Sequence, residues 1–187
     1  MKKIAIITPV PDVIEILIKN SIIRKSIHNK VAEIQTIDLR EHGIGNYKQI
    51  DDTPFGGGDG MIMMAEPLIN AIGCAFDFIG NSKNVNIIYP SPQGLLWNQN
   101  AAEKVSGLDN IIFICGHYKG IDERIIEKYV TIEYSVGDFI MTSGEIPAMM
   151  MLDSALRLVP GTLNNLNSAL SDTFTLGLLD HPHYTQP

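Results

Sequence analysis

Apolar residues in this chain occur either as short continuous runs or as longer segments with helical spacing. The continuous runs are rich in isoleucine and valine and cover residues 3–8, 85–89, 111–115 and 130–134. Runs of this kind predict strands that are buried on both faces, and the alternating segment 31–37 predicts another strand. The segments that we expect to be helical cover residues 12–27, 64–78, 98–106, 121–128 and 144–159.

The order of these segments predicts the fold class. Strands that alternate with helices favour an α/β domain with a largely parallel sheet and helices on both faces. A chain of 187 residues is long enough for one such well-buried domain. Residues 164–171 are rich in Asn and Ser and have no apolar period, so they predict a flexible linker.

Three predicted strands end in loops rich in glycine or proline. These loops follow Tyr89, Cys115 and Tyr134. In open α/β sheets, ligands bind outside the carboxyl ends of the strands, and glycine lets backbone groups approach a ligand closely. The three loops therefore predict one ligand site.

Composition and charge narrow the class of protein. A net charge of −7 argues against binding nucleic acid by bulk electrostatics, although a local basic patch stays possible. No apolar run reaches the roughly 20 residues of a membrane span, and Pro9 and Pro11 interrupt the N-terminal run. Cys74 and Cys115 both lie in apolar segments, which argues against a disulfide framework. We expect a cytoplasmic protein that is not membrane-bound.

Several motifs have both a chemical and a simple structural interpretation. The glycine cluster at residues 56–60 lacks the Lys-Ser/Thr of a phosphate-binding loop, so it is either a mobile turn or a lip over a large substrate. The five histidines form no zinc-type pair, and Cys115 beside His117 is better explained as a core cysteine than as a nucleophile. We therefore predict no metal ligand.

Arg157 and Asp172 also allow two interpretations. Arg157 follows Asp153 by four residues, which is the spacing of a salt bridge along a helix. Asp172 could cap a turn at residues 173–174. From the residues alone, these structural roles are preferred.

Five motifs in fixed order carry a resemblance to a known family. They are PFGGGDGM (54–61), YPSPQG (89–94), CGHYKGIDER (115–124), SVGDFIMTSGEIPAM (135–149) and GLLDHPHYTQP (177–187). From residue 4 to residue 187 the chain resembles the bacterial tRNA (guanine-N1)-methyltransferases of the TrmD family, in the SPOUT superfamily. The resemblance implies an α/β fold with a deep trefoil knot, and a homodimer with active sites at the interface.

The same resemblance implies a domain organisation. Residues 1–163 would form the SPOUT catalytic domain, which binds S-adenosylmethionine in a bent shape. Residues 164–187 would form a linker and catalytic segment that leads to a C-terminal tRNA-binding domain, which these 187 residues do not include. The linker would order when tRNA binds.

The resemblance also implies the reaction, methylation of N1 of the guanine just 3′ of the tRNA anticodon. Guanine N1 carries a proton at neutral pH, and a carboxylate can take that proton as N1 attacks the methyl group. By resemblance this base is Asp172, and Arg157 would stabilise the negative charge that develops on guanine O6.

The resemblance also implies further site residues, at the positions that match the family motifs. Those matching cofactor-binding positions are Tyr89, Ser91, Pro92, Gly116, Tyr118, Gly120, Val136, Gly137, Phe139, Met141, Gly144 and Pro147. Those matching positions near the target base are Gly57, Gly58, Asp59, Gly60, Asp180, His183 and Tyr184.

The chain departs from the family pattern at several positions. Lys119 stands where the family has an acidic residue associated with a magnesium requirement. This difference argues against Mg²⁺ as a cofactor without excluding it. Thr53, His117 and Gln186 replace arginine, and Asp59 replaces proline. Two alternatives remain: a catalytically weak module that binds cofactor or RNA, and a Rossmann-type dinucleotide enzyme, whose Gly-x-Gly-x-x-Gly motif is absent.

Overall fold

A five-stranded parallel sheet forms the centre of the protein. The computed structural model describes residues 1–80, 82, 84–163, 181–182 and 184–186. Within them the strand order is β2-β1-β6-β5-β7, and each neighbouring pair is parallel. The strands are β1 (Lys2–Thr8), β2 (Ala32–Asp38), β5 (Asn86–Leu96), β6 (Asn110–Ile114) and β7 (Ile132–Ser135).

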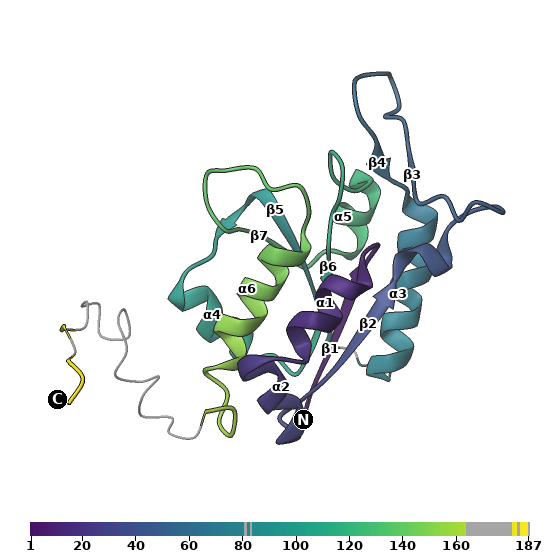
Figure 1. The fold of residues 1–187 in the computed structure, drawn as a ribbon. Helices are drawn as coiled ribbons and strands as arrows, with labels where there is room; N and C mark the ends of the chain where they lie inside the picture. Colours follow the sequence, from purple (N-terminus) through teal and green to yellow (C-terminus); the bar gives the residue numbers. More distant parts are fainter. Residues whose placement is uncertain (81, 83, 164–180, 183, 187) are drawn as a thin grey trace.

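Helices cover both faces of this sheet (Figure 1). One face carries α1 (Pro11–Ile18), α2 (Ser21–His28), α4 (Gln99–Ser106) and α6 (Glu145–Leu156), and the other carries α3 (Ala65–Ile79) and α5 (Glu123–Tyr129). Alternate residues of a strand pack against opposite helix layers. Ile4 and Ile6 of β1 pack on the side of α1, α2, α4 and α6, whereas Ala5 and Ile7 pack on the side of α3 and α5. All four are fully buried, which explains the continuous apolar run. The predicted α/β fold is confirmed.

One predicted helix is wrong, because residues 12–27 form two helices. Helix α1 ends at Ile18 and α2 begins at Ser21. Between them Asn20 is extended, its side-chain amide donates to the Ile16 carbonyl, and Ser21 has a positive φ of 57°. Asn and Ser side chains compete with helical hydrogen bonding in this way, and they break a helix that apolar spacing alone would continue.

A hairpin projects from the end of the molecule where the parallel strands finish (Figure 1). It consists of β3 (Asp51–Asp52) and β4 (Ile62–Met63), which pair in antiparallel fashion around residues 53–61. A 3-10 helix, Leu39–His42, directly follows β2. Strand β4 is bonded to the loop after β6, since the Met63 N–H donates to the Gly120 carbonyl over 3.0 Å and the Lys119 N–H donates to the Met61 carbonyl over 3.1 Å.

Strand β5 extends beyond the predicted residues 85–89. Its pairing with β7 shifts register between Pro90 and Leu95 and then resumes, with Leu95 opposite Tyr134 and Leu96 opposite Ser135. The predicted loop after Tyr89 is therefore an irregularity inside β5. In the described part of the chain, none of the helices is both long and apolar enough to cross a membrane.

Candidate active site

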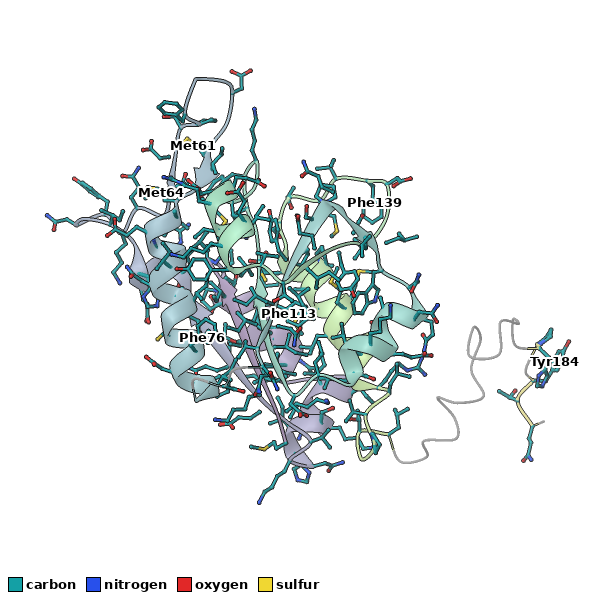
Figure 2. The ribbon with its side chains drawn as sticks, turned by 180° about the vertical axis from the view of Figure 1, so that it is seen from behind. Met61, Met64, Phe76, Phe113, Phe139 and Tyr184 are labelled. Carbon is teal, nitrogen blue, oxygen red and sulfur yellow. The ribbon has the colours of Figure 1, made fainter. Side chains whose placement is uncertain are left out.

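A cavity of about 300 Å³ lies at the carboxyl ends of β5, β6 and β7. We call it the loop pocket, and its wall is formed by residues 89–92, 116–120, 134–137, 139–144 and 147. All twelve positions predicted to bind a cofactor lie in this wall: Tyr89, Ser91, Pro92, Gly116, Tyr118, Gly120, Val136, Gly137, Phe139, Met141, Gly144 and Pro147. Figure 2 shows Phe139 of this wall and Met61 of the hairpin at the same end of the molecule, away from the central Phe113.

Backbone contact between two loops closes the bottom of the pocket. The Gly144 N–H donates to the Gly116 carbonyl over 2.8 Å, and His117 and Ser143 form an antiparallel bridge. A Cβ on Gly144 would lie 2.7 Å from the Gly116 nitrogen and 2.9 Å from the Cys115 Cα. Only glycine at position 144 allows this approach.

Aromatic rings supply much of the remaining wall. The Phe139 ring covers Gly137, where a Cβ would lie 2.8 Å from the ring, and Gly137 has a φ of 143°. Tyr89 is buried, and burial together with the nearby Glu133 charge raises the pKa of Tyr89 to about 12. The Tyr89 hydroxyl therefore stays neutral near pH 7, so this aromatic part of the wall carries no charge. Such a surface fits a flat, largely uncharged ring system.

A buried carboxylate fixes the start of α6 to two other segments. Glu145 is 2% exposed and accepts hydrogen bonds from the Thr8 hydroxyl over 2.5 Å and from His117 Nε2 over 2.8 Å. Burial raises the pKa of the Glu145 carboxyl, but the hydrogen bonds from His117 and Thr8 outweigh burial and hold this pKa below its ordinary value. Glu145 thus joins β1, the loop after β6 and α6 directly beneath the loop pocket.

Replacing Glu145 with glutamine should lower the stability of the protein at neutral pH. The variant should then lose less stability than the wild type as the pH falls. A carboxyl whose pKa is lowered by folding stabilises the protein above its unfolded-state pKa, and that contribution disappears as the pH falls through the folded-state pKa. The difference in Tm between the wild type and Glu145→Gln should therefore shrink from pH 7 to pH 3. The exposed Glu103→Gln is the control and should match the wild type throughout. A Tm difference that is constant with pH would contradict the role of the charge.

The residues predicted near the target base lie in two places. Gly57, Gly58, Asp59 and Gly60 lie in the exposed loop of the β3–β4 hairpin, and Gly60 contacts the side chain of Lys119 at the pocket wall. Asp180 and His183 lie outside the described residues. Tyr184 is 91% exposed, and Figure 2 shows it away from the loop pocket.

Of the two predicted catalytic residues, the structure describes only Arg157, which does not line the loop pocket. Asp172 lies outside the described residues. Arg157 follows the last residue of the 12-residue helix α6, about 18 Å from the pocket end of that helix. Burial raises the pKa of the Asp153 carboxyl and the charge of Arg157 opposes this shift, so the expected interaction along the helix is present electrostatically.

Eight residues of the pocket wall are not among the site residues predicted from the sequence. They are Pro90, His117, Lys119, Tyr134, Ser135, Ile140, Thr142 and Ser143. All lie within the three predicted loops or beside them, so contiguity with the predicted positions was the available signal. Among the described residues, no group of three or more His, Cys, Asp or Glu side chains is placed to hold a metal ion.

The fold and the loop pocket together define a class, an α/β domain with its ligand site at the carboxyl ends of parallel strands. Comparison with known proteins then identifies the family. All of residues 1–187 match the family described as tRNA (Guanine-1)-methyltransferase TrmD. The chain belongs to this family, which confirms the resemblance found in the sequence.

Individual relatives agree with this assignment. The chain is 44% identical to the tRNA (guanine-N(1)-)-methyltransferase of Listeria welshimeri over 99% of this chain and 75% of the relative. It is 42% identical to the enzyme of the same description from Christiangramia forsetii, again over 99% of this chain and over 80% of the relative. The chain also matches the crystal structure of the tRNA (m1G37) methyltransferase from Aquifex aeolicus, with a TM-score of 0.82 and 31% sequence identity. This match covers 100% of this chain and 76% of the Aquifex aeolicus chain.

Proposed function

We propose that this chain transfers a methyl group from S-adenosylmethionine to N1 of the guanine 3′ to the anticodon of tRNA. The chain is an enzyme of the tRNA (guanine-N1)-methyltransferase class by its family. The observation that carries the proposal is the loop pocket, in whose wall all twelve predicted cofactor-binding positions meet.

Two properties of the loop pocket support S-adenosylmethionine as its ligand. Its volume of about 300 Å³ is at the lower end of small-molecule sites, and its wall combines aromatic rings with the glycine-containing backbone of the loops after β6 and β7. The adenine would bind to backbone groups of the loops after β6 and β7. The bound donor supplies an activated methyl group on its sulfonium.

Two side chains would complete the reaction. Asp172 would accept the proton of guanine N1, which makes N1 a nucleophile. Arg157 would stabilise the charge that develops on guanine O6. Holding N1 in line with the methyl group contributes much of the remaining acceleration.

A homodimer would bring Arg157 to a pocket. Ile146, Met150 and Arg157 share one stripe of α6, because they are spaced four and seven residues apart. Ile146 and Met150 are 41% and 49% exposed, and Leu96, at the end of β5, is 62% exposed. If two copies of α6 pack antiparallel along this stripe, Arg157 of each copy approaches the pocket end of the other helix. We therefore propose a homodimer with shared active sites.

Replacing Met150 with aspartate should break this dimer. The charge would be buried without a partner at the centre of the helix pair, which costs about 3 kcal/mol or more. Sedimentation velocity should show monomers, and methyl transfer should be lost with the dimer. The control is Ile69→Asp, on α3 at the opposite face of the sheet, where Ile69 is 41% exposed compared with 49% for Met150. A dimeric Met150→Asp protein would contradict the proposed interface.

We also propose the trefoil knot and the two-part organisation that the family implies. Strand β5 lies between β6 and β7, yet Gly144 after β7 contacts Gly116 after β6. Residues 136–143 therefore pass over the end of β5, and a knotted chain needs such a crossing. Residues 1–163 would be the catalytic domain, and residues 164–187 would lead towards a tRNA-binding domain.

The direct test is methyl transfer from labelled S-adenosylmethionine to a tRNA with guanine beside its anticodon. Mass spectrometry of the digested tRNA should detect 1-methylguanosine at that position. The same tRNA with adenine at this position is the matched control and should remain unlabelled. Binding of S-adenosylmethionine without transfer would overturn the proposal in favour of a module that only binds the cofactor.

A further inference from the structure

The loop pocket contains one side chain with a permanent positive charge. Among the described residues of its wall, Lys119 is the only lysine or arginine, and no aspartate or glutamate lines the cavity. His117, the other basic residue of the wall, directs Nε2 at Glu145 beneath the pocket. The ammonium of Lys119 therefore has no carboxylate competing for it within the wall.

The backbone of Lys119 is fixed on both sides. Its N–H donates to the Met61 carbonyl over 3.1 Å, and the Gly120 carbonyl accepts from the Met63 N–H over 3.0 Å. Tyr118 and Gly120, its neighbours, both have positive φ values, 58° and 127°. This turn holds Lys119 between the β3–β4 hairpin and the loop pocket.

The side chain of Lys119 is held as well. A Cβ on Gly60 would lie 3.0 Å from Cε and 3.2 Å from Cδ and Cγ of Lys119, so the aliphatic part of the lysine lies against Gly60. Because Lys119 is exposed overall, its ammonium can stay hydrated at the mouth of the pocket until an anion arrives. A lysine that is already positioned loses less side-chain entropy when it binds.

We propose that Lys119 binds the carboxylate of the amino-acid portion of the methyl donor. This inference rests on the proposed function. It makes Lys119 the residue of the loop pocket that distinguishes donors with a carboxylate from ligands without one. The apolar wall suits the nucleoside portion, whereas the carboxylate needs a cation, and Lys119 provides the one permanent cation in that wall. A charge-assisted hydrogen bond of this kind is roughly twice as strong as a neutral one. An RNA phosphate is the competing anion, but Lys119 lines the donor cavity itself.

The test compares two ligands that differ by the amino-acid portion. S-adenosylhomocysteine has the carboxylate, and methylthioadenosine keeps the nucleoside and the sulfur without it. Lys119→Met preserves the aliphatic contact with Gly60 and removes only the charge. Calorimetry should show about a tenfold loss of affinity for S-adenosylhomocysteine and a change within about twofold for methylthioadenosine. Lys119→Arg should retain most of the affinity, and Lys104→Met, an exposed lysine on α4, is the control.

Other outcomes would overturn the inference. Equal losses for both ligands would mean that Lys119 only supports the shape of the pocket. Unchanged S-adenosylhomocysteine binding, with weaker and less salt-dependent tRNA binding, would assign Lys119 to an RNA phosphate. If the wild type bound neither ligand, the proposed function itself would fail and this inference with it.

Discussion

Replacing Asp172 with asparagine should lower kcat for methyl transfer by about 10²- to 10⁴-fold, the usual contribution of a general base. Asparagine preserves the size of aspartate but cannot accept the N1 proton. Affinity for S-adenosylmethionine should stay within about twofold, because Asp172 is not one of the twelve predicted cofactor positions, which line the loop pocket. Single-turnover transfer of a labelled methyl group, beside calorimetry of the donor, measures both quantities.

The matched control is Asp77→Asn, an exposed aspartate on α3, which should transfer methyl groups at the wild-type rate. Equal rates for Asp172→Asn and the wild type would remove Asp172 from the mechanism. A subunit carrying Asp172→Asn, mixed with one whose loop pocket is blocked, also tests the shared site. Some activity should return, because each partner then supplies what the other lacks.

Replacing Gly144 with alanine should both destabilise the protein and weaken donor binding. The added Cβ would lie 2.7 Å from the Gly116 nitrogen, 2.9 Å from the Cys115 Cα and 3.1 Å from the Cys115 carbonyl carbon. These are backbone atoms, so relief requires the two loops to separate, at a cost of about 1–3 kcal/mol. The hydrogen bond from Gly144 to Gly116 would be strained in the same movement. Urea unfolding should show this loss, and calorimetry should show at least about a tenfold loss of S-adenosylmethionine affinity.

Gly73→Ala gives the opposite expectation for the same chemical change. Gly73 lies exposed within helix α3, and nothing lies within 4 Å of the position its Cβ would take. Alanine is the better helix former by about 1 kcal/mol, so Gly73→Ala should raise stability and leave donor binding unchanged. If Gly144→Ala behaved like Gly73→Ala, the loops would not be in the close contact that we describe.

Much of the sheet could be predicted because its physical cause is local. Strands buried on both faces need an apolar residue at every position, and residues 111–115 satisfy this need in an uninterrupted run. The place of the site followed from the same runs, since loops at the carboxyl ends of neighbouring parallel strands must meet. The individual residues of the site were predicted from the family motifs. The structure places all twelve predicted cofactor positions around one cavity.

What could not be predicted depends on contacts between distant residues. Glu145 bonds to Thr8, 137 residues away, and to His117, 28 residues away, and no local pattern indicates either pairing. The contact between Lys119 and Gly60 likewise depends on how β4 pairs with the loop after β6. The break between α1 and α2 was missed for another reason, because apolar spacing continued across Asn20 and outweighed its turn preference.

The length of α6 has a consequence for how this enzyme can vary. One end of the helix forms part of the loop pocket through Gly144 and Pro147, and the other end carries Arg157. One inserted residue would turn Arg157 by about 100° around the helix axis and displace it by about 1.5 Å. In the proposed dimer, each guanidinium would then leave the stripe that faces the other copy. We therefore expect related chains to tolerate substitutions along α6 much more readily than insertions or deletions within it.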